Sequence, residues 1–134
     1  MMTMMYIPLF YGAPCGSLDE ILNDDTHDYL PVPETLAYGR KLFAVQVTGN
    51  SMTGANIESG DSVIADATER PIDTCVGRII VASVDGKTTV KRLRISDDGY
   101  ILQPENDEYK SYHIQPYEKF RVMGVVVSVQ KPIE

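Results

Sequence analysis

The sequence LFAVQVTGNSM, residues 42–52, joins an alternating apolar run to a small polar turn. The apolar residues at every second position are Phe43, Val45 and Val47. This period of two is typical of a half-buried β-strand. Gly49 permits a sharp turn behind the strand, and Ser51 follows that turn. We therefore predict a strand over residues 42–48 whose end presents a serine hydroxyl.

Short runs of the same kind continue along the chain and are separated by turn residues. They cover residues 61–65, 78–84, 87–95, 100–102 and 120–129. Asp85-Gly86 and Asp98-Gly99 are two-residue hairpin signals between consecutive runs. Short strands with glycine-containing turns and almost no helix predict a mostly β fold, a compact domain of short antiparallel strands.

The residues ahead of this domain have a different character. Residues 1–41 contain four prolines and an acidic run, and no helical or strand period is sustained through them. Composition of this kind favours an extended arm over a packed unit. We therefore divide the chain into an N-terminal arm, residues 1–41, and a folded domain, residues 42–134.

The composition restricts the classes of function. The chain has 134 residues and a net charge of -7, so we expect one domain that does not bind the nucleic-acid backbone unaided. Forty-one residues are too few and too proline-rich for a helix-turn-helix domain, so direct sequence-specific DNA binding is not expected. We expect no signal peptide and no membrane span, and a cytoplasmic location. Two cysteines without metal-ligand spacing predict no metal and no cofactor.

Ser51 and Lys91 are the candidate catalytic pair. A serine hydroxyl needs a base to act as a nucleophile, and a lysine is that base only where desolvation keeps it neutral. Alternation along the strand puts Thr89, Lys91 and Leu93 on one face, with Lys91 directed inward. The backbone N–H groups of Ser51 and Asn50 are candidates for the oxyanion hole. Taken singly, each residue is better explained as a polar turn or as a solvated lysine.

The bond Cys15-Gly16 in the arm gives this pair a substrate within the same chain. Residues 17–41 span at most about 80–90 Å when extended, so the bond can reach Ser51 of its own or of a neighbouring subunit. The small Gly16 allows close approach of an extended backbone. Together the three features indicate a Ser–Lys peptidase that cuts its own arm. His27 and His113 are isolated, so a Ser-His-Asp triad is not expected.

Five short motifs follow one another in order along the folded part of the chain. They are GNSM (49–52), ESGD (58–61), VDGKTTVKRL (84–93), LQPEN (102–106) and VMGVV (122–126). This series resembles the C-terminal peptidase domain of the LexA repressor and its relatives, over residues 42–129. The resemblance implies a LexA-like fold in which Ser51 is the nucleophile and Lys91 the general base.

Within this LexA/UmuD family the N-terminal stretch is similar to the UmuD-like branch, because PLF at residues 8–10 precedes Cys15-Gly16. The resemblance implies that Cys15-Gly16 is the bond cut. It also implies a homodimer, stimulation by RecA filaments on single-stranded DNA, and a role in the SOS DNA-damage response. The shortened dimer would then be the accessory subunit of a UmuC-type error-prone translesion DNA polymerase.

Other interpretations stay open on the sequence alone. One is a non-catalytic dimeric interaction module that binds a polymerase or a repressor and keeps Ser51 and Lys91 only as relics. Another is a regulator that cleaves or inhibits a different protein in trans. A signal-peptidase relative also uses serine and lysine, and the expected lack of a membrane anchor argues against it.

Overall fold

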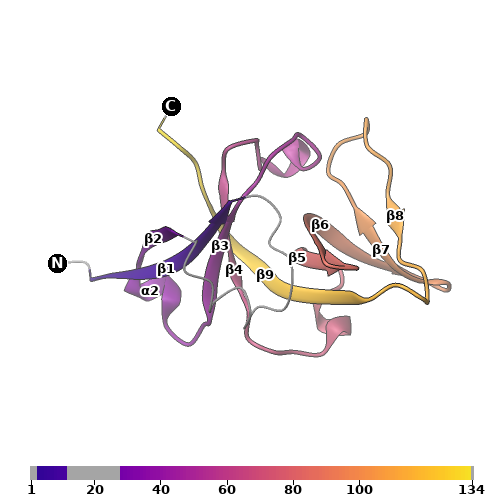
Figure 1. Cartoon of the computed structure of the whole chain (residues 1–134), viewed down its shortest axis with the longest axis horizontal. Helices are drawn as coiled ribbons and strands as arrows, with labels where there is room; N and C mark the ends of the chain where they lie inside the picture. The colour runs from indigo at the N-terminus through magenta and orange to yellow at the C-terminus, as the bar shows by residue number, and fades with distance from the viewer. Residues whose placement is uncertain (1–2, 12–27, 134) are drawn as a thin grey trace.

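The computed structural model of this chain describes residues 3–11 and 28–133, and their strands form one nine-stranded sheet (Figure 1). The strands are β1 (Met4–Tyr11), β2 (Asp28–Pro33), β3 (Leu42–Gln46), β4 (Ser62–Asp66), β5 (Ile79–Val84), β6 (Lys87–Ser96), β7 (Gly99–Gln103), β8 (Tyr112–His113) and β9 (Phe120–Gln130). Their order across the sheet is β2-β1-β3-β4-β9-β5-β6-β7-β8. The predicted mostly β fold is therefore confirmed.

The six strands predicted from residue 42 onward are all present as β3, β4, β5, β6, β7 and β9. The hairpin between β5 and β6 turns at Asp85 and Gly86, which have φ angles of 49° and 82°. Two consecutive positive φ angles are the geometry of a tight hairpin turn whose twist matches its strands. The Asp-Gly signal in the sequence thus predicted the turn that brings Lys91 alongside β5.

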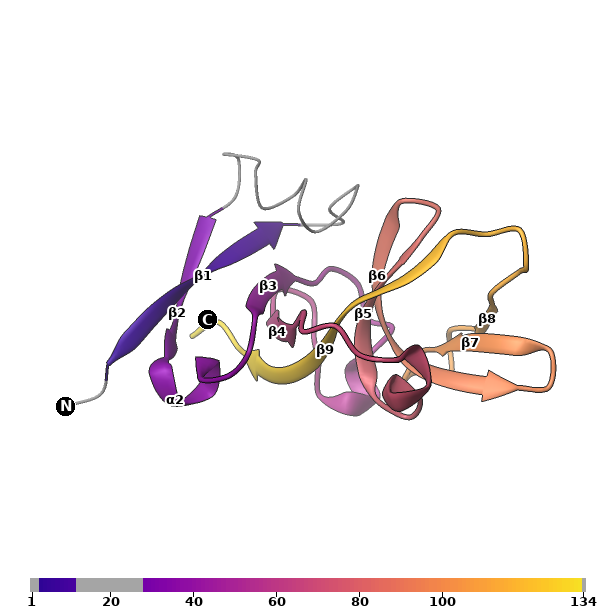
Figure 2. The ribbon, with the colours of Figure 1, turned by 90° about the horizontal axis from the view of Figure 1, so that it is seen from below.

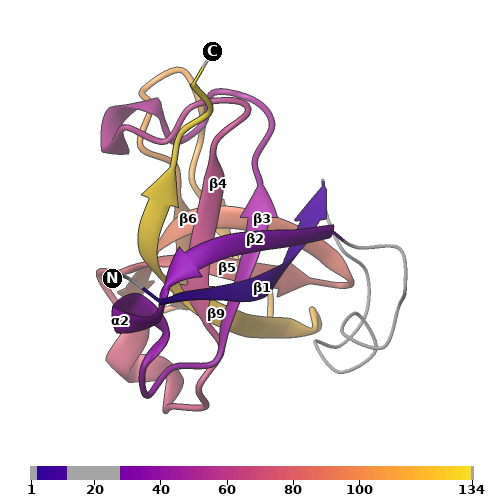
Figure 3. The same ribbon diagram turned by 90° about the vertical axis from the view of Figure 1, so that its left-hand side faces the viewer.

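The segments on either side of residues 12–27 are extended, as predicted for the arm, and they pair within the sheet. β1 pairs antiparallel with β2 and parallel with β3 (Figure 3). The sequence did not predict this pairing, because the buried residues of β1 do not alternate regularly: Leu9 and Phe10 are adjacent and both buried. The division of the chain at residue 41 stays a prediction, since β1 and β2 belong to the same sheet as the later strands.

Short helical turns occupy three of the connections. They are α2 (Glu34–Ala37) between β2 and β3, and the 3-10 turns η1 (Thr53–Ala55) and η2 (Ile72–Cys75). Cys75 in η2 is a free thiol, 1% exposed, and it packs with Ile80 and Leu93. The connection between β4 and β5 is thus anchored in the core through Cys75.

β9 links the two halves of the sheet. Its residues 125–130 pair with β4 and its residues 120–125 pair with β5. Each pairing contains a register shift, one at Ile64/Ala65 and one at Val81/Ala82. Bulges of this kind bend a strand and increase its twist. Figure 2 shows β9 passing between the β3–β4 side and the β5–β8 side of the molecule.

Gly124 lies where β9 crosses the core. A Cβ at this position would stand 2.8 Å from Phe43 Cε1, 3.0 Å from Ala65 Cβ and 3.0 Å from the Asp66 carbonyl oxygen. These neighbours belong to β3 and β4, and Phe43 and Ala65 are almost fully buried. The crossing therefore has no room for a side chain.

We expect Gly124→Ala to lower the free energy of unfolding by about 1–3 kcal/mol, because a rigid core must shift to admit the methyl group. Urea unfolding of the variant would show this as a lower midpoint with an unchanged slope. Ser128→Ala in the same strand is the control, since it adds no atom. Equal midpoints for Gly124→Ala and the parent protein would contradict the close packing of β9 on Phe43.

Candidate active site

Ser51 lies in the loop that follows β3, and this loop is anchored at both ends. Val47 N donates to the Asp61 carbonyl oxygen at 2.8 Å, and Gly60 N donates to the Val47 carbonyl oxygen at 2.9 Å. The residue after Ser51 is buried in the core: Met52 is 4% exposed and belongs to the core cluster around Phe43. The serine is therefore fixed between a paired strand end and a buried methionine.

A second segment, residues 105–106 behind β7, fixes the same loop from outside. Glu105 N donates to the Ser51 carbonyl oxygen at 2.8 Å, and Gly54 N donates to the Glu105 carbonyl oxygen at 2.7 Å. Asn106 Nδ2 donates to the Asn50 carbonyl oxygen at 2.8 Å. We call this set of contacts the 105–106 clamp. A Cβ on Gly54 would stand 2.5 Å from the Glu105 carbonyl oxygen, so the clamp requires glycine there.

Arg92 supports the clamp from β6. Its Nε donates to the Glu105 carboxylate, and its Nη1 donates to the Gly77 carbonyl oxygen at 2.7 Å. Glu105 is thus held by its backbone to the Ser51 loop and by its side chain to β6. Because Lys91 is the residue before Arg92, the clamp links the serine loop to the strand that carries the lysine.

Lys91 meets Ser51 at hydrogen-bond distance. The amine Nζ lies 2.9 Å from Ser51 Oγ, 2.8 Å from Thr89 Oγ1 and 3.1 Å from the Val90 carbonyl oxygen. Burial lowers the pKa of the Lys91 amine below its ordinary value, because desolvation disfavours the charged form. No carboxylate of the described residues lies within ion-pair distance of Nζ to offset this effect.

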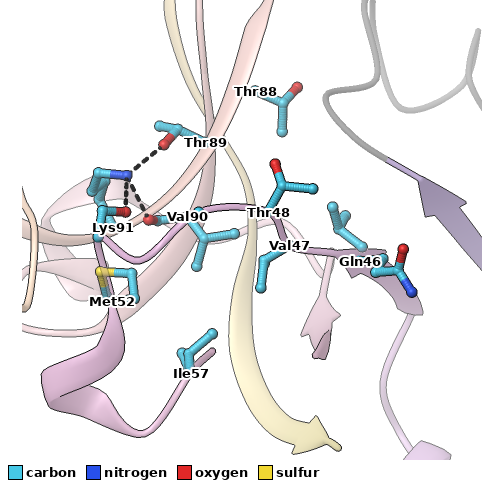
Figure 4. A pocket seen from close by; sticks show the side chains of 12 residues that line it. Gln46, Val47, Thr48, Met52, Ile57, Thr88, Thr89, Val90 and Lys91 are labelled. Atoms are coloured by element: carbon cyan, nitrogen blue, oxygen red, sulfur yellow. Dashed lines mark hydrogen bonds between the residues drawn. The ribbon is translucent and has the colours of Figure 1, made fainter. Parts of the chain in front are cut away.

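The pair opens into a pocket of about 120 Å³ between the end of β3 and the first half of β6. Its walls are Val45, Gln46, Val47, Thr48, Gly49, Ser51, Met52, Ile57, Thr88, Thr89, Val90 and Lys91. Figure 4 shows the Lys91 amine beside the Thr89 hydroxyl, with Val47, Val90 and Ile57 forming an apolar wall. An apolar wall excludes water from one side of the amine, which is the physical cause of its lowered pKa.

Of the site residues predicted from the sequence, two lie in contact in the structure and two lie outside the residues that the structure describes. Ser51 and Lys91 are hydrogen-bonded. No hydrogen bond from the backbone N–H groups of Asn50 and Ser51 is found in the described part of the chain, and their role in an oxyanion hole stays a prediction. Cys15 and Gly16 lie outside the described residues.

Sequence reasoning missed the roles of Thr89 and of the 105–106 clamp. Alternation places Thr89 on the same face as Lys91, but it does not indicate that the Thr89 hydroxyl accepts a hydrogen bond from the amine. The clamp residues belong to the LQPEN motif, which in the sequence carries only a family resemblance. No local pattern indicates that a backbone segment behind β7 returns to the Ser51 loop.

A serine hydroxyl held against a desolvated amine in a pocket is the arrangement that nucleophilic acyl transfer uses. The fold and the site thus define a β-sheet domain of the serine hydrolase type. A family model described as Peptidase S24-like matches residues 8–127, so the chain belongs to this family of serine peptidases.

Curated relatives match over nearly the whole chain. The LexA repressor of Lacticaseibacillus casei is 33% identical over 123 residues, which cover 90% of this chain and 54% of that protein. The LexA repressor of Frankia alni is 35% identical over 129 residues, 96% of this chain and 48% of the repressor. The LexA repressor of Corynebacterium glutamicum is 34% identical over 128 residues, which cover 96% of this chain and 52% of that repressor. The chain spans about half the length of these relatives.

No helix in residues 3–11 and 28–133 has the length and apolar character needed to cross a membrane. Within the same ranges no group of three or more His, Cys, Asp or Glu side chains is placed to hold a metal ion.

The pH dependence of stability provides a test of the lowered pKa of the half-buried Lys91 amine. A depressed folded-state pKa means that the unfolded chain binds the proton more tightly, so Lys91 destabilises the fold below its folded-state pKa. This penalty disappears as the pH rises above the unfolded-state value of ~10.4. In the Ser51→Ala protein, which keeps the chain intact, we expect the unfolding free energy of Lys91→Met, minus that of the protein with Lys91, to fall as the pH rises from the folded-state pKa to the unfolded-state pKa of the lysine.

Chemical denaturation at a series of pH values between 6 and 11 measures this difference, with Lys119→Met on the surface as the matched control. A difference that stays constant with pH for Lys91→Met would show that Lys91 is as well solvated in the folded state as in the unfolded chain.

Proposed function

We propose that this protein is a self-cleaving serine peptidase in which Ser51 is the nucleophile, Lys91 the general base, and Cys15-Gly16 the bond cut. The observation that carries the proposal is the 2.9 Å hydrogen bond between Lys91 Nζ and Ser51 Oγ, at an amine whose pKa burial lowers. A neutral amine at this distance has a lone pair available for the serine proton.

The proposed reaction proceeds in two acyl-transfer steps. Lys91 takes the proton of Ser51 Oγ, and the oxygen attacks the carbonyl carbon of Cys15. The N–H groups of Ser51 and Asn50 stabilise the resulting oxyanion. Protonated Lys91 then gives its proton to the nitrogen of Gly16 as the peptide bond breaks. Water hydrolyses the ester on Ser51, so that residues 1–15 become a separate peptide with a terminal carboxylate.

The direction of β1 supports cleavage within the same chain. β1 runs parallel to β3, and Tyr11 at its end pairs with Gln46 at the end of β3. Cys15 follows Tyr11 by four residues, and Ser51 follows Gln46 by five. β1 and β3 therefore end side by side. The proposed cleavage bond follows the end of β1, and the nucleophile follows the end of β3 after a nearly equal number of residues. An extended stretch of four residues spans about 13 Å.

The biological role that we propose is that of a UmuD-like accessory subunit. The Cys15-Gly16 bond that follows PLF at residues 8–10 supports this assignment within the peptidase family, whereas the curated relatives that the chain matches are named LexA repressor. In this role a cytoplasmic homodimer responds to RecA filaments on single-stranded DNA during the SOS response. The shortened dimer then joins a UmuC-type error-prone translesion polymerase. The net charge of -7 favours action through protein partners over direct contact with DNA.

Mass spectrometry of the purified chain at pH 7 and pH 10 tests the peptidase proposal. We expect fragments that end at Cys15 and begin at Gly16, formed faster at pH 10 because Lys91 is more fully deprotonated. Ser51→Ala and Lys91→Ala should each abolish them, whereas Lys119→Ala should not.

If the chain stays intact at both pH values, even with activated RecA filament, the peptidase proposal fails. The non-catalytic dimeric interaction module, which binds a polymerase or a repressor, would then be the better account. Cleavage at another bond would retain the dyad and overturn the assignment of Cys15-Gly16.

The 105–106 clamp predicts a second effect on the cleavage rate. Asn106→Asp removes the Nδ2 donor to the Asn50 carbonyl oxygen while it keeps the oxygen that accepts from Glu108 N. We expect the rate to fall about tenfold, the equivalent of one lost hydrogen bond of ~1.4 kcal/mol. The exposed neighbour variant Asp107→Ala is the control. An unchanged rate in Asn106→Asp would exclude a positioning role for the Asn106 contact of the clamp.

A further inference from the structure

β1 is an inner strand of the sheet, although it comes from the segment that the proposed cleavage would detach. Residues 4–9 pair with residues 28–33 of β2 on one side, and residues 9–11 pair with residues 44–46 of β3 on the other. The carbonyl oxygen of Thr3 also accepts a hydrogen bond of 2.9 Å from Glu34 N. Hydrogen bonding along both edges holds β1 independently of its covalent connection.

β1 also contributes side chains to two core clusters. Ile7 is 5% exposed and Leu9 is 7% exposed, and both pack with Val32, Leu42 and Ala44 in one cluster. Phe10 is 7% exposed and belongs to the other cluster, where its ring meets that of Phe43 edge to face with centroids 6.5 Å apart. Loss of β1 would expose the apolar surface that these three side chains now cover.

β2 depends on β1 for its place in the sheet. In the described part of the chain β1 is the only strand that pairs with β2, and it separates β2 from β3. Val32 of β2 is 1% exposed and lies in the same cluster as Ile7 and Leu9. Departure of β1 would therefore leave two strands with unpaired edges and would uncover a fully buried valine, which is a strong physical reason for β1 to stay.

We propose that the fragment of residues 1–15 remains bound as β1 after the bond is cut, as a non-covalent strand between β2 and β3. This inference rests on the proposed function, because cleavage at Cys15-Gly16 is what separates β1 from the rest of the chain. Cleavage then turns a permanent strand into an exchangeable one. The slot it occupies, lined by the β3 edge and the cluster around Val32 and Ala44, accepts a strand with apolar residues in the Ile7, Leu9 and Phe10 pattern.

The experiment uses the full chain in a form that does not depend on self-cleavage. A Ser51→Ala protein carries a recognition sequence for a site-specific protease between β1 and β2, and the protease supplies the cut. Native mass spectrometry then follows the nicked protein after dilution to 1 µM and gel filtration. We expect one species of the uncut mass plus one water, which separates into two fragments only under denaturing conditions.

Side-chain variants connect retention to the packing of β1. Phe10→Ala and Leu9→Ala should each speed loss of the fragment by about 100-fold, because each removes a buried side chain from the strand. Tyr6→Ala is the matched control on the same strand, since Tyr6 is 70% exposed and should change the rate less than about threefold. A fluorescent peptide of residues 1–15 should replace the bound fragment of each protein at the rate at which that protein loses its fragment.

Loss of the fragment from the nicked parent protein during gel filtration, without rebinding of added peptide, would overturn the proposal. Equal rates for Phe10→Ala, Leu9→Ala and Tyr6→Ala would also overturn it, because retention would not then depend on the buried side chains. If the parent protein, which keeps Ser51, does not cleave itself, the proposed peptidase is contradicted. Retention of the fragment in the nicked Ser51→Ala protein is a separate result and is not affected.

Discussion

The contact between the Lys91 amine and the Ser51 hydroxyl is the interaction on which the proposed chemistry depends. It combines a distance of 2.9 Å with burial that lowers the lysine pKa, and no carboxylate in the described residues offsets that burial. A nearby carboxylate would favour the protonated amine, which has no lone pair to take the serine proton. The polar partners of the amine are instead neutral, the Thr89 hydroxyl and the Val90 carbonyl oxygen, which hold its position without restoring its charge.

The fold has to bring distant strands together to make this contact. Three strands, β4, β9 and β5, separate β3 from β6 in the sheet, yet the loop after β3 reaches the side chain of Lys91 on β6. The bulged pairings of β9 bend the sheet between the two halves, as Figure 2 shows. The 105–106 clamp then ties the Ser51 loop to the β6 side through Arg92. The bent sheet and the 105–106 clamp thus both position Lys91 Nζ next to Ser51 Oγ.

The sequence predicted most of the elements and the central pair, but not their assembly. Alternating apolar residues indicated the strands from residue 42 onward, and the Asp85-Gly86 turn set the β5–β6 hairpin. β1 escaped prediction because Leu9 and Phe10 are adjacent and face two different core clusters. The clamp and the role of Thr89 escaped it because both depend on contacts between segments far apart in the chain, or on the direction of one hydroxyl. Such contacts have no local periodicity.

The measurement that tests the central claim most directly is the titration of the Lys91 amine by NMR. Carbon-13 at Cε of lysine reports the charge on Nζ, and comparison with Lys91→Met assigns the signal. The Ser51→Ala protein keeps the chain intact during the titration. Our account predicts a midpoint clearly below the ~10.4 of a solvated lysine. A midpoint at or above that value would show that the amine stays charged at neutral pH, and would contradict Lys91 as the general base.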